Sequence, residues 1–226
     1  MPIHSVIFNV ERVPTGQPQH GELVTLIWAI FATSPLGKAK VQEMHDAQTV
    51  SPFTWSYAMN GNEISLSFSA LPDEVISPFI TALEKLKGIA VTVPGCAFKV
   101  KSVFPQEDIA FLMPRMTLRA QSGINVTCGG TGHKKPLWYE SDSARWLKRI
   151  EEGLVRKADF FCPGKVHTAH VDRVRKSFIT KTLYRGASFC YPAYTFRLQA
   201  DEDTMKVALY AGVGQHTGIG FGHCAV

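Results

Sequence analysis

The spacing of apolar residues in the first half of the chain predicts an alternation of strands and helices. Residues 4–12 alternate between apolar and polar and predict a strand, whereas 22–32 is strongly apolar and begins with helix formers. Further elements are expected as a short helix over 36–45 after Pro35, strands over 53–59 and 64–69 around the Asn60-Gly61-Asn62 turn, a helix over 72–87, and strands over 90–93 and 97–104. This β-α-β-β-α-β order is that of a ferredoxin-like unit.

The second half partly repeats this order without repeating the sequence. Strands are expected over 115–119, 124–128, 165–171, 176–184 and 188–199, with Gly186 marking a hairpin, a helix capped by Ser141 and running to about residue 158, and a last helix over 201–211 before a final strand. We therefore predict an α+β protein made of two tandem ferredoxin-like domains, residues 1–112 and residues 113–226.

Charge is distributed unevenly between the two halves. Residues 1–113 hold 7 Lys/Arg and 10 Asp/Glu, a net charge of −3, whereas residues 114–226 hold 17 and 9, a net charge of +8. Basic residues of the second half alternate with aromatic and short polar ones, as in Lys181-Thr182-Leu183-Tyr184-Arg185. Such mixtures place cations on phosphates and flat groups on bases, so the asymmetry indicates an RNA partner, a solvated basic surface being the alternative.

Glycines cluster between residues 212 and 222, in the sequence G-V-G-Q-H-T-G-I-G-F-G. Glycine backbones can take positive φ, and their N–H groups can converge on an anion such as a phosphate. The cluster is neither a P-loop, since no Gly-Lys-Ser/Thr follows, nor a dinucleotide fingerprint, since no βαβ unit follows. A phosphate-backbone contact is expected here, and a simple turn joining two elements remains the alternative.

The remaining composition argues against export and against a metal. No basic start followed by a long apolar stretch opens the sequence, and the longest apolar run is too short to span a bilayer. The five cysteines include no C-x-x-C pair, which is typical of reduced thiols, so a cytoplasmic protein without membrane contact is expected. Cys162, His167 and His170 lack a fourth ligand at suitable spacing, and no metal or other cofactor is predicted.

Two stretches resemble a known family. The glycine cluster after two ferredoxin-like units is similar to the C-terminal loop of the RAMP proteins of CRISPR systems. Met44-His45-Asp46, followed by Pro52-Phe53-Thr54-Trp55-Ser56, resembles a segment of the repeat-processing CRISPR endoribonucleases, and the apolar helix before it also matches. The resemblance covers nearly the whole chain, with both stretches in the expected order.

The resemblance implies metal-independent cleavage of CRISPR precursor RNA within its repeats, often at the base of a small hairpin. The ribose 2′-hydroxyl attacks the adjacent phosphorus and expels the 5′-oxygen, which leaves a 2′,3′-cyclic phosphate, and the enzyme often stays bound to its product. The reaction needs a base, an acid and a group that stabilises the phosphorane charge. His45 occupies the position of the family's catalytic histidine, and a histidine titrates in the range that proton transfer requires.

The chain departs from the family at two positions. Trp28 stands where a tyrosine is common, and Ser51 where a lysine often precedes the Pro-Phe-Thr segment. Lys38, two helical turns before His45, is a candidate for the missing cation. Lys38 and Ser51 therefore join His45 as candidate catalytic residues.

RNA contact is expected from the second half. The candidate residues are Arg115, Arg119, Lys134, Lys135, Arg145, Arg149, Arg173, Arg175, Lys176, Gly212, Gly214, His216, Thr217, Gly218, Gly220 and Gly222. The expected partner is CRISPR repeat RNA, with other subunits of a CRISPR effector complex as possible further partners.

Two other functions are considered as alternatives. A non-catalytic RAMP subunit that holds guide RNA in an effector complex would fit the loss of the tyrosine and the lysine. A two-histidine phosphoesterase would need paired H-x-T/S motifs, and neither His167-Thr168-Ala169 nor His170-Val171-Asp172 supplies one.

Overall fold

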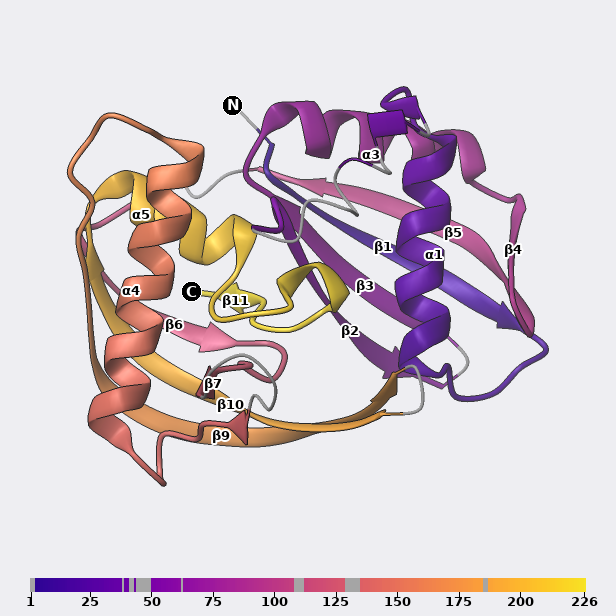
Figure 1. The fold of residues 1–226 in the computed structure, drawn as a ribbon. Helices are drawn as coiled ribbons and strands as arrows, with labels where there is room; N and C mark the ends of the chain where they lie inside the picture. Colours follow the sequence, from indigo (N-terminus) through magenta and orange to yellow (C-terminus); the bar gives the residue numbers. More distant parts are fainter. Residues whose placement is uncertain are drawn as a thin grey trace.

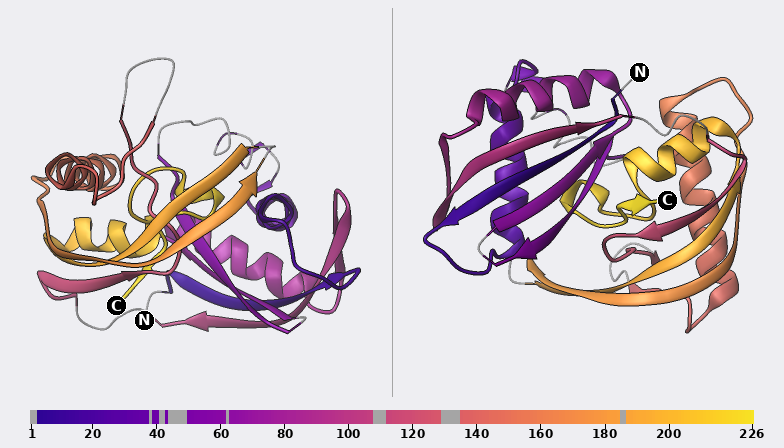
Figure 2. Two further views of the ribbon diagram at one scale, coloured as in Figure 1. Left: turned by 90° about the horizontal axis from the view of Figure 1, so that it is seen from below. Right: turned by 180° about the vertical axis from the view of Figure 1, so that it is seen from behind.

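The computed structural model describes residues 3–37, 39–40, 43, 50–61, 63–107, 112–128, 135–184 and 187–226. The first half forms a five-stranded antiparallel sheet with two helices packed on one face (Figures 1 and 2). Its elements are β1 (Ser5–Val13), α1 (His20–Thr33), β2 (Phe53–Asn60), β3 (Glu63–Ala70), α3 (Asp73–Leu86), β4 (Ala90–Val93) and β5 (Cys96–Gln106). The strand order β2-β3-β1-β5-β4 is ferredoxin-like, with β4 added at one edge.

The alternating residues of β3 show why this sheet forms. Ile64, Leu66 and Phe68 are fully buried under the helices, whereas the serines between them lie on the other face. Phe68 stacks on Phe79 of α3 with ring centroids 3.9 Å apart, so the apolar side chains of the strand and of the helix share one core.

The second half forms a four-stranded sheet in the order β11-β6-β10-β9, also antiparallel (Figure 1). Its elements are β6 (Arg115–Ala120), the short pair β7 (Thr127–Cys128) and β8 (Lys135–Pro136), α4 (Ser143–Phe161), β9 (Ala169–Tyr184), β10 (Ala187–Ala200), α5 (Glu202–Lys206), the π-helix η1 (Val207–Ala211), the 3₁₀ turn η2 (Thr217–Ile219) and β11 (Cys224–Ala225). The second sheet is therefore also ferredoxin-like, and the predicted fold class is confirmed.

Several boundaries differ from those expected. Asp142, not Ser141, caps α4, since its Oδ1 accepts a hydrogen bond from Arg145 N at 3.0 Å. The strands expected over 165–171 and 176–184 form one long strand, β9, which continues through Arg173 at a positive φ of 51°. The pairing of β9 with β10 shifts register in this region, which indicates a β-bulge. The sequence pattern suggests a break between two strands at the position of this bulge.

Three further expectations are only partly met or lie outside the described residues. Of the strand predicted over 124–128, only Thr127–Cys128 is strand, and Asn125 makes an isolated bridge to Gln215. The last helix changes from α to π geometry after Lys206. Part of the helix predicted over 36–45 and the turn at Gly186 lie outside the described residues.

The two halves meet along the segment that follows η1, which lies between the two sheets (Figure 1, yellow). The long β9–β10 ribbon extends from the second half toward the first, where β9 contacts α1. None of the described helices is both long and apolar enough to cross a membrane.

Candidate nucleic-acid interface

The glycine loop, residues 212–222, begins where η1 ends at Gly212 with φ of 80°. Lys157 of α4 donates hydrogen bonds from Nζ to the carbonyl oxygens of Ala211 at 3.3 Å and Gly212 at 2.7 Å. Carbonyls at a helix end lack partners within the helix, and a cation is favoured there. Burial lowers the pKa of Lys157 to about 7. The lysine that binds the carbonyl groups at this helix end therefore titrates near neutral pH.

Several glycines of this loop are required by close packing. A Cβ on Gly222 would overlap the carbonyl oxygen of Val213, and one on Gly220 would lie 2.8 Å from the Trp55 ring. A Cβ on Gly212 would lie 2.9 Å from the Thr54 side chain. The loop therefore folds tightly on itself and against β2 of the first half, in space that no larger residue could share.

Hydrogen bonds fix the loop on the first half. Trp55 donates from Nε1 to Gly218 O at 3.2 Å, and Thr54 donates from Oγ1 to Phe221 O at 3.1 Å. His20, the first residue of α1, stacks on Trp55 and donates from Nε2 to Ile219 O at 2.6 Å. Burial lowers the pKa of His20, against the opposing effect of this hydrogen bond, so the neutral ring is favoured.

His223 continues the attachment just beyond the loop. Its Nδ1 lies 2.7 Å from Ser56 Oγ and its Nε2 lies 3.2 Å from Ser69 Oγ, which joins the ring to β2 and β3. The side chain is buried, and burial lowers its pKa to about 4. Neither His20 nor His223 was expected to have a role, because the residues that bind them are distant in sequence.

The buried His223 predicts acid sensitivity of this attachment. An unfolded histidine titrates near 6.5, so between pH 6.5 and 4 the unfolded chain binds a proton that the folded chain does not, and stability falls as pH falls. Between pH 7.5 and 5.0 this group should cost about 2 kcal/mol. In urea unfolding, His223→Gln should lose less free energy of unfolding between pH 7.5 and 5.0 than the wild type does, by about 2 kcal/mol. An equal loss in the two proteins would contradict a buried neutral His223.

The loop is less accessible than its sequence suggests. Gly220 N donates to Thr217 O and Gly222 N donates to Gly123 O, so these N–H groups do not face an external anion. Gly212, Thr217, Gly220 and Gly222 are buried, and the expectation that these residues contact RNA stays a prediction. Among the predicted loop residues, His216 is exposed and Gly214 and Gly218 are partly exposed.

Of the candidate catalytic residues, the structure describes only Ser51. Its hydroxyl donates to Phe53 O at 2.9 Å, and it lies against the glycine loop, because a Cβ on Gly218 would be 2.8 Å from Ser51 Oγ. His45 and Lys38 lie outside the described residues. Trp28 is partly buried and packs edge-on against Phe53, with ring centroids 5.7 Å apart.

The predicted basic residues are divided between two faces of the second sheet. Thr195 of β10 pairs with Arg119 of β6 on one side and with Arg175 of β9 on the other, so these arginines share the face that α4 and α5 leave open. Arg115 lies on the same face and donates to Gln199 Oε1. The other exposed basic candidates described are Lys135 on β8, Arg145 and Arg149 on α4, and Arg173 and Lys176 on β9; Lys134 lies outside the described residues.

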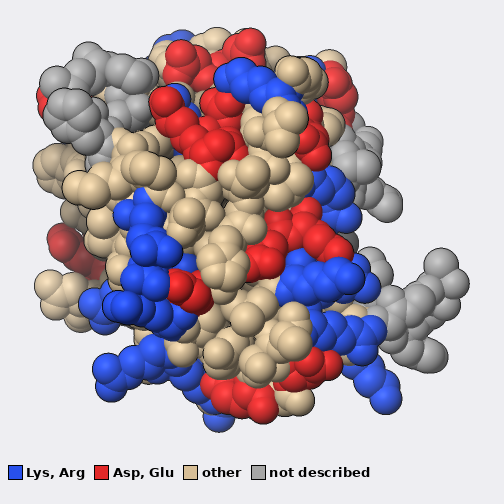
Figure 3. Space-filling model, turned by 90° about the vertical axis from the view of Figure 1, so that its left-hand side faces the viewer, with Lys and Arg blue, Asp and Glu red and all other residues tan. Residues whose placement is uncertain are grey.

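Acidic groups lie among the basic ones on the side of the molecule that Figure 3 shows. Lys176 illustrates this, because its Nζ lies 3.6 Å from Glu140 and 5.6 Å from the centre of the Trp138 ring.

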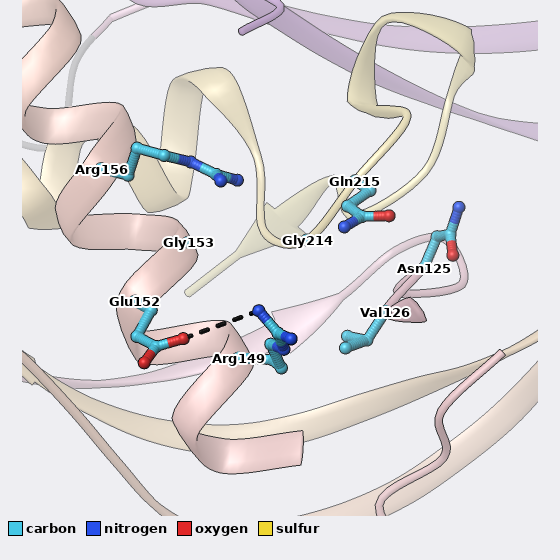
Figure 4. Close-up of a pocket in the computed structure, with 8 residues that line it drawn as sticks. All are labelled: Asn125, Val126, Arg149, Glu152, Gly153, Arg156, Gly214 and Gln215. Atoms are coloured by element: carbon cyan, nitrogen blue, oxygen red, sulfur yellow. Dashed lines mark ion pairs between the residues drawn. The ribbon is translucent and has the colours of Figure 1, made fainter. Parts of the chain in front are cut away.

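Two of the predicted RNA-binding residues, Arg149 of α4 and Gly214 of the glycine loop, line one cavity (Figure 4). The other residues that line it are Asn125, Val126, Glu152, Gly153, Arg156 and Gln215.

A possible ligand cluster near α5 is already occupied by protein donors. His167, Asp201 and Asp203 have donor atoms within 4.8 Å of one another. Asp201 caps α5 through Thr204 N at 3.0 Å, and Asp203 pairs with Lys165 at 2.5 Å. His170 pairs with Glu151 instead, and we assign no metal to these residues.

Two ferredoxin-like sheets with a glycine loop docked between them define the double-ferredoxin class of proteins. Residues 105–226 match the family model described as CRISPR associated protein Cas6, C-terminal, and the chain belongs to this family. No curated protein sequence matches the chain.

Solved structures of similar fold include Cas6 proteins. One described as CRISPR associated protein Cas6 has 15% identity and a TM-score of 0.73, with 99% of each chain covered. A Cas6-related protein from Pyrococcus furiosus has 14% identity and a TM-score of 0.76, with 99% of this chain and 98% of that chain covered. A Cas6 product complex has 15% identity and a TM-score of 0.62, with 99% of each covered. These likenesses confirm the fold.

Proposed function

We propose that this chain is an endoribonuclease that cleaves CRISPR precursor RNA within its repeats, without a metal ion, and remains bound to the product. The observation that carries the proposal is the docking of the glycine loop beside Ser51, at the start of β2. The family model matches the second half of the chain, whereas the candidate catalytic residues belong to the first half. The contact between the glycine loop and Ser51 brings the two halves together at the candidate site.

His45 is proposed as the general acid or base of the reaction. The 2′-hydroxyl proton must leave as oxygen attacks phosphorus, and the 5′-oxygen must gain a proton as the bond to phosphorus breaks. Lys38 would stabilise the charge of the phosphorane. The Ser51 hydroxyl, which donates to Phe53 O in this structure, would turn to donate a hydrogen bond to the phosphorane beside Gly218. The products are a 2′,3′-cyclic phosphate and a 5′-hydroxyl end.

Residues 1–112 are proposed as the catalytic domain and residues 113–226 as the RNA-binding domain. Related structures are described as a Cas6 product complex, a Cas6 substrate mimic complex and a Cse3 endoribonuclease bound to 19 nt RNA. The exposed arginines of α4 and of the open sheet face are placed to neutralise phosphates of a repeat RNA.

A second function is favoured by one observation. Trp28, at the position where the resembled enzymes often have tyrosine, packs against Phe53 and has no acidic proton to transfer. A non-catalytic subunit that holds guide RNA in a CRISPR effector complex would tolerate this residue.

Cleavage of a repeat RNA in excess EDTA separates these functions. The purified chain is incubated with the repeat RNA of its host's own CRISPR array, and the fragments are resolved on a denaturing gel. We expect cutting at one site, at a rate that EDTA leaves unchanged, with a fragment whose 3′ end accepts a ligated adapter only after acid opening and phosphatase treatment. Tight binding without cutting would instead support the guide-RNA subunit, and loss of cutting in EDTA would contradict metal independence.

A further inference from the structure

A cavity of about 170 Å³ lies between α4 and the glycine loop. Its α4 wall is formed by Arg149, Glu152, Gly153 and Arg156, whose spacing of three and four residues places them on one face of the helix (Figure 4). The opposite wall is formed by 125–126 and 214–215, and Gln215 N donates to Asn125 O at 2.8 Å, which holds these two segments together.

The side-chain polar groups that face this cavity are mainly hydrogen-bond donors. The guanidinium groups of Arg149 and Arg156 extend from α4 toward the loop (Figure 4). Gln215 Oε1 accepts a hydrogen bond from Thr127 Oγ1 at 2.8 Å, which turns the amide so that Nε2 faces the α4 side. Guanidinium and amide N–H groups converging on one space match the oxygens of a phosphate.

The charge around the cavity is unbalanced. Arg149 has a partner in Glu152, with Nη1 3.9 Å from Oε2, whereas Arg156 makes no ion pair or hydrogen bond with the part of the chain that the structure describes. Two cations therefore face one carboxylate, and the carboxylate is exposed. An anion that entered would pair with Arg156 and compete with Glu152 for Arg149.

The cavity is large enough for a phosphate. A space of roughly 10–15 Å³ on this measure holds one water, so about 170 Å³ leaves room for a phosphate with its oxygens. Gly153 lines the cavity without a side chain, and a Cβ there would meet no atom within 4 Å, so the space beside it is open. The cavity therefore has room for an anionic group beside Arg149 and Arg156.

We propose that this cavity is a binding site for one phosphate of the RNA backbone, at the junction of α4 and the glycine loop. The identity of the RNA rests on the proposed function, whereas the site itself requires only the donors described above. The glycine loop packs on β2 beside Ser51, so a phosphate bound here would anchor the RNA to the element that joins the two halves. The site therefore governs binding and leaves bond cleavage to other residues.

Equilibrium binding of a fully 2′-O-methylated repeat RNA tests this site, since that RNA lacks the attacking hydroxyl and stays intact. Arg156→Gln should weaken binding about tenfold at 0.1 M salt and lower the slope of log affinity against log salt by about one. Glu152→Gln should tighten binding because it removes the competing carboxylate. Gly153→Leu, which fills the space without changing the charge, should weaken binding as Arg156→Gln does. Lys85→Gln on α3 is the matched control, with wild-type affinity and slope expected.

Other outcomes would overturn the proposal. Wild-type affinity and salt slope in both Arg156→Gln and Gly153→Leu would exclude an RNA phosphate from the cavity, once thermal melting shows both variants folded. Calorimetric binding of inorganic phosphate that Arg156→Gln abolishes, with RNA binding unchanged, would make it a free-anion site instead. Failure of the nuclease proposal would leave these binding effects in place, so the two failures are distinguishable.

Discussion

Alanine in place of His45 is expected to lower the single-turnover rate of repeat cleavage by a factor of about 100 to 10,000. The 2′-hydroxyl is a very weak acid and the 5′-oxygen a poor leaving group, so the loss of one positioned proton donor or acceptor affects the barrier directly. Affinity for the 2′-O-methylated repeat RNA should stay within about twofold, because the basic residues that contact phosphates are unchanged.

His170→Ala is the matched control for this experiment. His170 is an exposed histidine on β9 that pairs with Glu151, so its removal should leave the rate unchanged. The pH profile adds a second readout, since the wild-type rate should change through a histidine pKa and the residual rate of His45→Ala should not. Equal cutting by His45→Ala would place the reaction elsewhere, and His216, the exposed histidine of the glycine loop, would be the next residue to replace.

Gly222→Ala is expected to destabilise the protein by at least about 4 kcal/mol, which is severe for a single substitution. Its φ of 68° is unfavourable for alanine, and the added Cβ would overlap the Val213 carbonyl oxygen. Val213 N donates to Gly222 O at 2.9 Å, so any shift that relieves the clash breaks this contact. The free energy of unfolding in urea measures the loss.

Gly164→Ala separates the two causes. Gly164 has a comparable φ of 85°, but a Cβ there would meet no atom within 4 Å. Its substitution should therefore cost only the backbone strain, about 1–2 kcal/mol. If Gly222→Ala is as stable as Gly164→Ala, the glycine loop has space for the added Cβ and the predicted clash with Val213 is wrong.

The first half could be predicted closely from its sequence because its signals are local. Ile64, Leu66 and Phe68 alternate with serines, and Asn60-Gly61-Asn62 marks the preceding turn, so strand and hairpin follow from neighbouring residues. β9 was divided wrongly because its continuity depends on pairing with β10 through a bulge at Arg173, which no local pattern reveals.

The candidate site shows the same limit. The sequence identified the glycine cluster but not its packing partners, since Thr54 and Trp55 lie more than 150 residues earlier in the chain. His20 and His223 carried no spacing motif, and only their burial against the other half reveals what they do. The importance of His45 came from resemblance rather than from its surroundings, and it stays a prediction.

The long separation between the glycine loop and β2 has a consequence for biosynthesis. Ser56 and His223 are 167 residues apart, so at roughly 5–20 residues per second a ribosome needs roughly 10–30 s between making the strand and making its partner. During that time β2 presents Trp55 and Thr54, which the loop later covers, to the surroundings of the nascent chain. The first sheet can thus form while the surface of β2 at Thr54 and Trp55 is still uncovered. A chaperone that binds exposed aromatic strands could bind the nascent chain at this stage.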